Sequence, residues 1–346
     1  MSNALANGGA ARVISILAKA FSEQGSKVGV VAYSPFPGEY PLPENIAKEY
    51  GPKGNSGISK VRRIAWLRSV PRRNPDAVIV AFEYFVNMQT LIACAGLPNK
   101  VVVSERNDPA RVGSGFPKGW LRERLYRRAD LLVCQTDEAA SYFSSKVRKC
   151  VILNPLKDGL PAPYTGVRRK AVVTFCRLER QKNLPMLIRA FARFHEEYPD
   201  YTLEIYGDGK ERETLISMID DLGLSDVAKI YPGRPDVHDV VRDASMFVLP
   251  SDYEGLSNSM LEAMAIGLPV ICTDCPCGGA RMVIEDGENG VLIPVGDEST
   301  LADVMEQTAS DPTLTAKLSR NAAILRERLS AAKICSEWMK AVNCGE

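Results

Sequence analysis

Short apolar runs recur along the chain and alternate with longer segments of helical periodicity. The runs are rich in Val, Ile and Leu at successive positions, which is typical of interior strands of a parallel sheet. Strands that alternate with helices in this way predict an α/β fold. The predicted strands cover residues 28–33, 77–81, 100–104, 131–135, 171–175, 201–206, 229–231, 246–250 and 268–272.

The segment Ser251–Pro269 is the most informative stretch of the chain. It follows a predicted strand, turns at Gly255, and carries N-cap residue types at Ser257–Ser259 before an apolar helical stripe. Gly267 and Pro269 then end the helix, and another strand begins. The helix N-terminus is therefore predicted at the carboxyl edge of a sheet, where open α/β sheets bind ligands and helix N–H groups favour a phosphate.

A length of 346 residues suggests two domains, each with its own core. The polar stretch 157–169 contains Pro and Gly and is interpreted as the linker. We therefore expect a first domain at 1–160, a second at 161–330, and a tail at 331–346 that packs back on the first domain as a helix. Residues 1–5 are too short and polar for a strand, so either the chain is truncated or the first sheet lacks its usual first strand.

The charge is unevenly divided, although the formal net charge is only +1. Residues 1–160 carry a net charge of +10 and the remainder −9, so a polyanionic surface partner is expected for the first half. Membrane phospholipid and nucleic acid are both candidates, but no nucleic acid is expected because the basic residues lack an associated recognition motif. Two basic clusters, 59–73 and 118–128, mix cations with Trp and Leu. The first is interpreted either as an amphipathic helix packed on its own sheet or as a helix at the membrane surface or near a diphosphate-lipid acceptor. The second favours the latter interpretation without deciding it.

Other composition signals fit a cytoplasmic protein that could contact the inner face of the membrane as a peripheral protein. No apolar run approaches the ~20 residues that span a bilayer, and no cleavable signal peptide is evident. The nine cysteines without regular spacing indicate reduced thiols. Cys272, Cys275 and Cys277 invite a zinc interpretation, but Cys-x-Cys without a fourth ligand is a poor tetrahedral site, so no metal is expected.

Cations and carboxylates follow the predicted strands of the second half. Arg177 and Lys182 come after one strand and before a helix, where they could stabilise the charge of a departing diphosphate. Glu254 and Glu262 frame the central turn. In the first half, polar residues cluster after the strand 100–104 as Glu105, Arg106 and Asn107, which makes them candidates to face a ligand.

These residues resemble the donor site of retaining glycosyltransferases of family 4, which have the GT-B architecture. The resemblance rests on Glu254, seven residues, Glu262 and the following Ala263–Val270, on Arg177 with Lys182-Asn183, and on the turn Gly207–Gly209. The segment Asp286–Pro294 also resembles the last hairpin-like element of that family. The match covers most of the chain and is strongest between Arg177 and Gly290.

The resemblance implies two Rossmann-like domains that face a cleft. The first domain would bind the acceptor, and the second would bind a nucleotide sugar, with UDP expected as the nucleotide. It implies transfer of a hexose or N-acetylhexosamine, with retention and without metal, to a glycan or polyprenyl-diphosphate-linked acceptor in bacterial capsule or O-antigen synthesis. Catalytic roles follow for Arg177, Lys182 and Glu254, and acceptor contacts for Glu105, Arg106 and Asn107. The implied donor contacts are Gly8, Gly9, Gly207, Asp208, Gly209, Gly233, Gly255, Leu256, Ser257, Asn258 and Glu262.

Departures from the family pattern leave two alternatives open. The first half has no histidine after the strand 100–104, and Cys176 stands where the family usually has Gly. A nucleotide-sugar epimerase of GT-B architecture would need acid and base side chains, and the two histidines of the chain, His195 and His238, are few for it. A catalytically silent nucleotide-sugar binding protein is the other alternative. His238 is expected to be a surface or packing residue.

Overall fold

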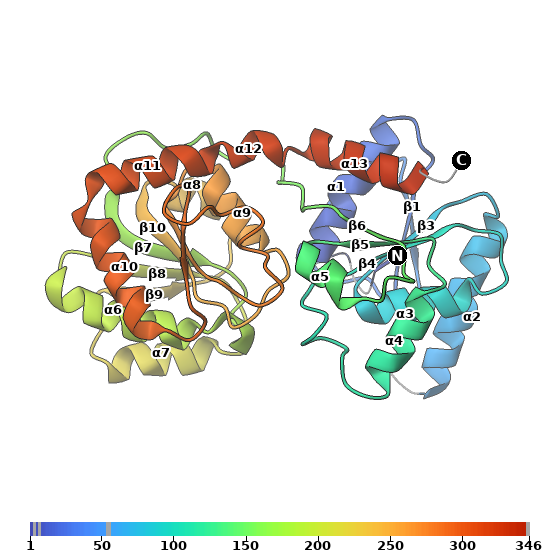
Figure 1. Cartoon of the computed structure of the whole chain (residues 1–346), viewed down its shortest axis with the longest axis horizontal. Helices are drawn as coiled ribbons and strands as arrows, with labels where there is room; N and C mark the ends of the chain where they lie inside the picture. Colours follow the sequence, from blue (N-terminus) through green and yellow to red (C-terminus); the bar gives the residue numbers. More distant parts are fainter. Residues whose placement is uncertain (3–4, 6–7, 53–56, 344–346) are drawn as a thin grey trace. The chain divides into compact units, whose positions relative to one another are not determined.

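The computed structural model describes residues 1–2, 5, 8–52 and 57–343, and the chain forms two compact units. The first unit joins Met1–Lys157 to Leu329–Glu346, and the second is Asp158–Arg328. Each unit is built on parallel strands with helices packed against them, as the alternation of apolar runs and helical segments predicts (Figure 1). The fold is therefore α/β with two Rossmann-like halves. None of the described helices is long and apolar enough to cross a bilayer.

The parallel strands of the first unit form two groups. The groups are β1 (Gly29–Ala32) with β2 (Ala47–Tyr50), and β3 (Ile79–Phe82), β4 (Val101–Ser104), β5 (Leu131–Cys134) and β6 (Lys149–Val151) in the order β3-β4-β5-β6. The helices are α1 (Gly9–Glu23), α2 (Gly57–Arg73), α3 (Tyr84–Ala93), α4 (Lys118–Tyr126), α5 (Asp137–Tyr142) and α13 (Ala331–Asn343).

Met1 and Ser2 lie between β1 and β3. The Ser2 N–H donates to the Val31 carbonyl (3.0 Å), and the Phe82 N–H donates to the Met1 carbonyl (3.1 Å). Ser2 also forms an isolated parallel bridge with Ala32. Among the described residues, Met1 and Ser2 thus link the two strand groups through backbone hydrogen bonds.

The second unit contains one six-stranded parallel sheet with the order β12-β11-β10-β7-β8-β9. Its strands are β7 (Arg169–Phe175), β8 (Thr202–Tyr206), β9 (Ala228–Tyr231), β10 (Ala244–Leu249), β11 (Val270–Thr273) and β12 (Val291–Ile293). Its helices are α6 (Leu184–Glu197), α7 (Arg212–Asp221), α8 (Val237–Val241), α9 (Asn258–Ala265), α10 (Glu298–Ser310), α11 (Pro312–Ala323) and α12 (Leu325–Arg328), with a 3-10 turn η1 (Arg180–Lys182).

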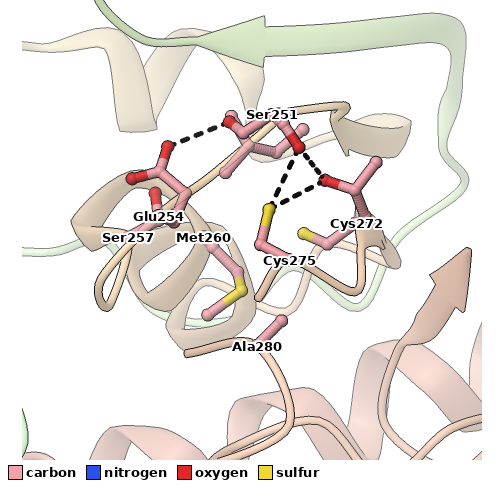
Figure 2. A pocket seen from close by; sticks show the side chains of 9 residues that line it. Ser251, Glu254, Ser257, Met260, Cys272, Cys275 and Ala280 are labelled. Carbon is pink, nitrogen blue, oxygen red and sulfur yellow. Dashed lines mark hydrogen bonds between the residues drawn. The ribbon is translucent and has the colours of Figure 1, made fainter. Parts of the chain in front are cut away.

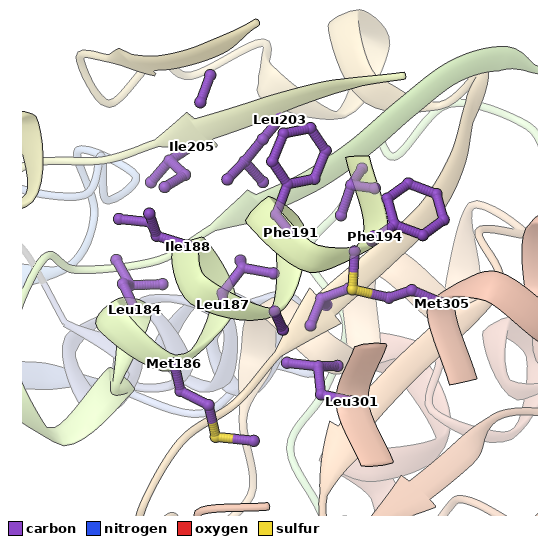
Figure 3. Close-up of a cluster of buried hydrophobic side chains, with 14 of the residues drawn as sticks. Leu184, Met186, Leu187, Ile188, Phe191, Phe194, Leu203, Ile205, Leu301 and Met305 are labelled. Carbon is purple, nitrogen blue, oxygen red and sulfur yellow. The ribbon is translucent and has the colours of Figure 1, made fainter. Parts of the chain in front are cut away.

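The core of the second unit explains why its central strands are apolar on both faces. Met246 and Val248 of β10 belong to the buried cluster that α6 and α10 complete (Figure 3). Phe247, between them, points to the opposite face because side chains alternate along a strand, and its ring lies 4.8 Å from that of Phe175. A strand buried on both faces cannot alternate polar and apolar residues, which accounts for the continuous apolar run.

Several local features differ from the sequence-based expectations, among them β6, for which no strand was predicted. β2 lies in a stretch for which no strand was predicted, because its residues are polar and partly exposed. Asp286–Pro294 contains a tight turn with an isolated bridge between Asp286 and Gly290, but its strand β12 pairs in parallel with β11 and not with an antiparallel hairpin partner. The unit boundaries fall at 157/158 and 328/329, two or three residues before the expected 160/161 and 330/331.

The C-terminal helix α13 is part of the first unit. Trp338 is fully buried, and its ring centroid lies 5.5 Å from that of Phe82 in β3. Lys100 Nζ donates to the Val342 carbonyl (2.6 Å). The helix also packs against α1. The chain therefore returns to its first unit after completing the second.

If α13 is an integral part of that core, Trp338→Ala should lower the free energy of unfolding by about 3–5 kcal/mol, because the substitution leaves a cavity beside Phe82. Chemical denaturation measures the change. The matched control is Trp120→Ala, an exposed tryptophan of the same unit, which should stay within about 0.5 kcal/mol of the parent. Equal losses in the two variants would contradict the assignment.

Candidate functional site

The loops that follow β9, β8, β7, β10 and β11 meet at one edge of the second unit. This follows from the topology, because these parallel strands are neighbours in the sheet and all run in the same direction. Backbone bonds join successive loops: Leu178 N–H donates to the Asp208 carbonyl, and Asp252 N–H to the Gln181 carbonyl, each over 2.9 Å. The predicted polar residues of the second half therefore share a single surface.

An ion pair joins the loops after β7 and β10. Lys182 Nζ contacts Glu254 Oε1, and Ser251 Oγ donates to the same oxygen (2.9 Å). Lys182 is only 7% exposed. Burial alone would lower the lysine pKa, but the adjacent carboxylate of Glu254 outweighs it and raises the pKa above its ordinary value. Lys182 is thus a fixed cation.

Further bonds hold the same two loops in register. Gln181 Nε2 donates to the Tyr253 carbonyl, and Asn183 Nδ2 donates to Asp252 Oδ1, both over 2.7 Å. Asn183 adopts a left-handed backbone conformation (φ 46°), which an Asn side chain tolerates better than most. Two side-chain amides therefore join loops that lie about 70 residues apart in the sequence.

Arg177 differs from Lys182 in being exposed. Its guanidinium makes no hydrogen bond or ion pair with any residue that the structure describes. Arg177 and Lys182 nevertheless lie close enough for each to influence the charge of Cys176, whose pKa is raised to about 11, chiefly by burial. The site therefore offers one fixed cation and one cation that is available to an anionic ligand.

The turn Gly255–Asn258 places the N-terminus of α9 at this edge of the sheet. The first bond within the helix runs from Leu261 N–H to the Ser257 carbonyl (3.1 Å), so the preceding amides are not used inside the helix. Gly279 packs directly on the turn: a Cβ at this position would lie 1.6 Å from the Gly255 carbonyl oxygen. Gly279 is therefore needed for the close approach of the two loops.

Glu262 lies inside the site rather than on the helix surface. It is 3% exposed, and its Oε2 lies 2.8 Å from Nε2 of His238, which is 5% exposed. A carboxylate only accepts hydrogen bonds, so the facing ring nitrogen carries the proton. Phe175 packs edge-on against the imidazole, with the ring centroids 5.1 Å apart. His238 is thus a packing residue with a specific polar partner, not a surface residue.

The glycines of the β8 and β9 loops permit close backbone approaches. A Cβ at Gly207 would lie 1.9 Å from the Cys176 carbonyl oxygen, and one at Gly209 would lie 2.2 Å from that of Leu178. Asp208 Oδ2 accepts from Gly233 N–H (3.0 Å), which ties the β8 loop to the β9 loop. The structure therefore brings all four predicted residues of these loops together beside the loop of Arg177.

A small pocket lies beneath the turn that carries Glu254, and Figure 2 shows its lining. The Ser251 carbonyl accepts from Thr273 Oγ1 (2.5 Å) and Cys275 Sγ (3.0 Å). Burial raises the pKa of the Cys275 thiol to about 12 and that of Cys272 well above its ordinary value. These cysteines are structural donors and packing groups. No group of three or more His, Cys, Asp or Glu side chains arranged for a metal occurs in the described ranges.

The predicted residues of the first half lie in the first unit. Gly8 precedes α1, which begins at Gly9. Arg106 and Asn107 are half-buried after β4. Arg106 Nη2 donates to Asn154 Oδ1, and Gln135 Nε2 donates to the same oxygen (2.7 Å), so the ends of β4, β5 and β6 are linked.

Glu105 lies deeper than its two neighbours. It is buried, and its carboxylate accepts a hydrogen bond from the Tyr126 hydroxyl, which also accepts from Asn87 Nδ2 (3.0 Å). Burial raises the Glu105 pKa to about 7, although Tyr126 and Arg122 oppose the shift. The structure thus separates Glu105, which supports the edge from below, from Arg106 and Asn107, which lie nearer to solvent.

Three residues near the sites had no predicted site role: His238, Asn154 and Glu83. Glu83 follows β3 directly and has φ 72°, a strained backbone for a residue with a side chain, and its charge acts on Arg106 and Glu105. A carboxylate directly after a predicted strand could have marked Glu83. No local signal could have found His238, because only the sheet order brings α8 beside α9.

Two family models together match most of the chain. The model described as Glycosyltransferase Family 4 matches residues 7–156, and the one described as Glycosyl transferases group 1 matches residues 166–324. Both matches follow the unit boundary seen in the structure.

Curated relatives of the chain are distant. It is 25% identical to the GalNAc-alpha-(1->4)-GalNAc-alpha-(1->3)-diNAcBac-PP-undecaprenol alpha-1,4-N-acetyl-D-galactosaminyltransferase of Campylobacter jejuni, over 98% of this chain and 96% of that protein. It is 28% identical to the exopolysaccharide phosphotransferase SCO2592 of Streptomyces coelicolor, over 83% of this chain but only 30% of that protein. The chain spans between 30% and 60% of the length of this and several other relatives.

Solved structures of GT-B proteins share the fold. Alr3699/HepE of Anabaena in complex with UDP aligns with a TM-score of 0.80 at 19% identity, over 99% of this chain and 98% of that one. The lipopolysaccharide outer core galactosyltransferase WaaB aligns with a TM-score of 0.77 at 18% identity, over 99% of both chains.

The contact between His238 and Glu262 can be tested through stability. His238→Phe keeps an aromatic ring but removes the N–H donor. The buried carboxylate of Glu262 then lacks this hydrogen bond, which should lower the free energy of unfolding by about 1–3 kcal/mol. Urea denaturation at neutral pH measures this loss. The control is His195→Phe, since His195 is only half-buried and stacks on Phe191. A loss no larger at His238 than at His195 would contradict the contact.

The raised pKa of Glu105 predicts a pH dependence of stability. Because the folded pKa of about 7 lies above the ordinary value of 4.5, the folded state binds the proton more tightly, and the contribution of this group is lost as pH rises between these values. Relative to Glu105→Gln, the native protein should lose about 3 kcal/mol of unfolding free energy from pH 4.5 to pH 7. Denaturation curves of the two proteins that stay parallel across this window would refute the shift.

Proposed function

Because the chain belongs to glycosyltransferase family 4, a family of retaining hexosyltransferases with the GT-B fold, we propose that it transfers a hexose or N-acetylhexosamine from a UDP-sugar to a glycan or lipid-linked sugar. The observation that carries the proposal is the meeting of Arg177, Lys182 and the α9 N-terminus at one sheet edge, with Glu254 and Glu262 beside them. Two cations and a helix N-terminus together provide a site for a diphosphate.

In the proposed reaction, the bond between the sugar and the diphosphate breaks and negative charge accumulates on the leaving phosphate oxygen. Lys182, held by Glu254, stabilises that charge without reorganising, and the exposed Arg177 supplies a second cation that pairs with the phosphates when the donor binds. The amides of the turn Gly255–Asn258 contact the same phosphates. The departing oxygen then helps to remove the acceptor proton as the acceptor attacks from the same face, so configuration is retained.

Glu254 and Glu262 receive different roles in this proposal. Glu254 contacts hydroxyls of the donor sugar, next to the small pocket beneath its turn. Glu262, oriented by His238, accepts hydrogen bonds from the ribose hydroxyls. The turns Gly207–Gly209 and Gly233 complete the donor surface. Gly8 and Gly9, at the start of α1, are proposed as further donor contacts through their backbone N–H groups.

For the acceptor, we assign contacts to Arg106 and Asn107, with Glu105 below them as support. A diphosphate in the acceptor would suit the guanidinium of Arg106. Relatives support the classes of both substrates: the name of the Campylobacter enzyme includes an undecaprenol-linked acceptor, and the Anabaena structure contains UDP. Exopolysaccharide and lipopolysaccharide relatives favour polysaccharide synthesis as the setting.

The first test is calorimetric binding of UDP and GDP. Arg177→Ala should weaken UDP binding by about 10- to 100-fold, since a hydrogen bond to a charged group is lost, and should leave uridine binding unchanged. The matched control is Arg180→Ala, another exposed arginine of the same loop, which should bind UDP like the parent.

Glu262→Ala should weaken the binding of UDP more than the binding of 2′,3′-dideoxy-UDP, because only UDP has the ribose hydroxyls that Glu262 is proposed to contact. A folded protein that binds neither nucleotide would overturn the proposal. Binding without release of UDP in a screen of UDP-sugars and acceptors would favour the silent binder, and interconversion of sugars without an acceptor would favour the epimerase.

A further inference from the structure

The first unit exposes large apolar side chains among cations at the start of α4. Phe116 is 89% exposed, Trp120 60% and Leu121 38%. Lys118 and Arg124 are exposed beside them, and the Arg124 guanidinium lies 5.8 Å from the Trp120 ring centroid. We call these five residues the α4 patch.

The rest of the segment is equally basic. Arg111, Arg127 and Arg128 are exposed as well. Between residues 111 and 128 the only acidic residue is Glu123, which is half-buried beside Arg127 (3.8 Å). Trp120, Arg124 and Arg127 or Arg128 follow one another at helical spacing, so aromatic and cationic groups share one face.

The opposite face of α4 anchors it firmly, so the exposure is not the result of a loose end. Leu125 and Tyr126 are buried. Arg122, also buried, donates to the carbonyls of Val112 (2.7 Å) and Pro109 (2.8 Å). This arginine fixes the loop that leads from β4 to the patch. Exposed apolar groups on a fixed scaffold indicate a binding surface.

In the other basic cluster of the first unit, the residues whose side chains are described expose one large apolar group, Val61 (69%), and no fully exposed aromatic ring. In α2, Leu67 and Val70 are buried, and Trp66 donates its indole N–H to Glu49 Oε1 (2.8 Å). Arg68 donates to the carbonyls of Ala93 (2.6 Å) and Ala95 (2.8 Å). The apolar and cationic groups of α2 are thus largely used within the unit, as the interpretation of a packed amphipathic helix predicted.

We infer that the α4 patch docks on the surface of an anionic phospholipid bilayer. Trp and Phe insert at the boundary between headgroups and acyl chains, while Lys and Arg pair with lipid phosphates. The patch combines both kinds of group and has no exposed carboxylate within residues 111–128. The net charge of +10 over residues 1–160 provides long-range attraction to the same surface.

Docking through this patch would also bring the proposed acceptor contacts near the membrane surface. One loop runs from Arg106 and Asn107, the proposed acceptor contacts, to Phe116, and Arg122 holds its middle. A membrane-anchored acceptor could therefore reach these side chains from the docked surface. This step rests on the proposed function, but the docking itself does not.

The test is co-sedimentation with vesicles of phosphatidylcholine containing 30% phosphatidylglycerol, compared with phosphatidylcholine alone. The parent should bind only the anionic vesicles, and less as salt rises. Phe116→Ser with Trp120→Ser, and separately Lys118→Gln with Arg124→Gln, should each reduce partitioning on the order of tenfold.

Two pairs of controls separate the patch from general surface properties. Val167→Ser with Ile324→Ser removes exposed apolar side chains of the second unit. Lys27→Gln with Lys146→Gln removes the same charge from exposed positions of the first unit. Both pairs should bind vesicles like the parent.

A second readout does not depend on variants. Brominated acyl chains should quench Trp120 in the bound protein, because Trp338 is fully buried and Trp66 is half-buried. Absence of binding to anionic vesicles, equal losses in the control pairs, or absence of quenching would overturn the inference. So would binding of RNA or self-association that displaces the vesicles and requires the same patch. UDP binding by the patch variants distinguishes a failure of docking from a failure of the proposed function.

Discussion

The ion pair between Lys182 and Glu254 is the interaction on which the second unit's site depends. Taking both charges out of water is costly, and an additional hydrogen bond from Ser251 to the carboxylate offsets part of that cost. The pair joins the loops after β7 and β10, which carry the available cation Arg177 and the N-terminus of α9. A lysine fixed in this way presents its charge without losing side-chain entropy on binding.

Close backbone contacts at glycines hold further loops at the same edge of the sheet. Gly207 and Gly209 let the β8 loop lie against the β7 loop, and Gly279 lets the β11 loop lie against the α9 turn. A rigid edge of this kind suits a ligand whose charge changes during reaction, because preorganised donors need not move. In the first unit, hydrogen bonds to one side chain hold the strand ends together. Asn154 accepts from both Arg106 and Gln135 and so links the ends of three strands.

Much of the fold follows from local pattern. All nine predicted strands are present within a few residues, because strands buried on both faces leave long apolar runs. β2 was missed since it is polar and half-exposed, and the parallel pairing of β12 was missed because a three-residue strand carries no sign of its partner. Spacing alone also could not separate Glu105, which is buried under Tyr126, from its neighbour Arg106.

The sequence by itself determined the two α/β halves, the placement of polar residues after strands, and the resemblance of the segment around Glu254 to family 4, because these depend on local periodicity and residue type. Only the tertiary structure decided that His238 orients Glu262, and that α4 rather than α2 exposes aromatic groups among cations. Both outcomes depend on which elements become neighbours and which faces they cover. That is set by the order of strands and the packing of helices, for which a single segment of sequence carries no signal.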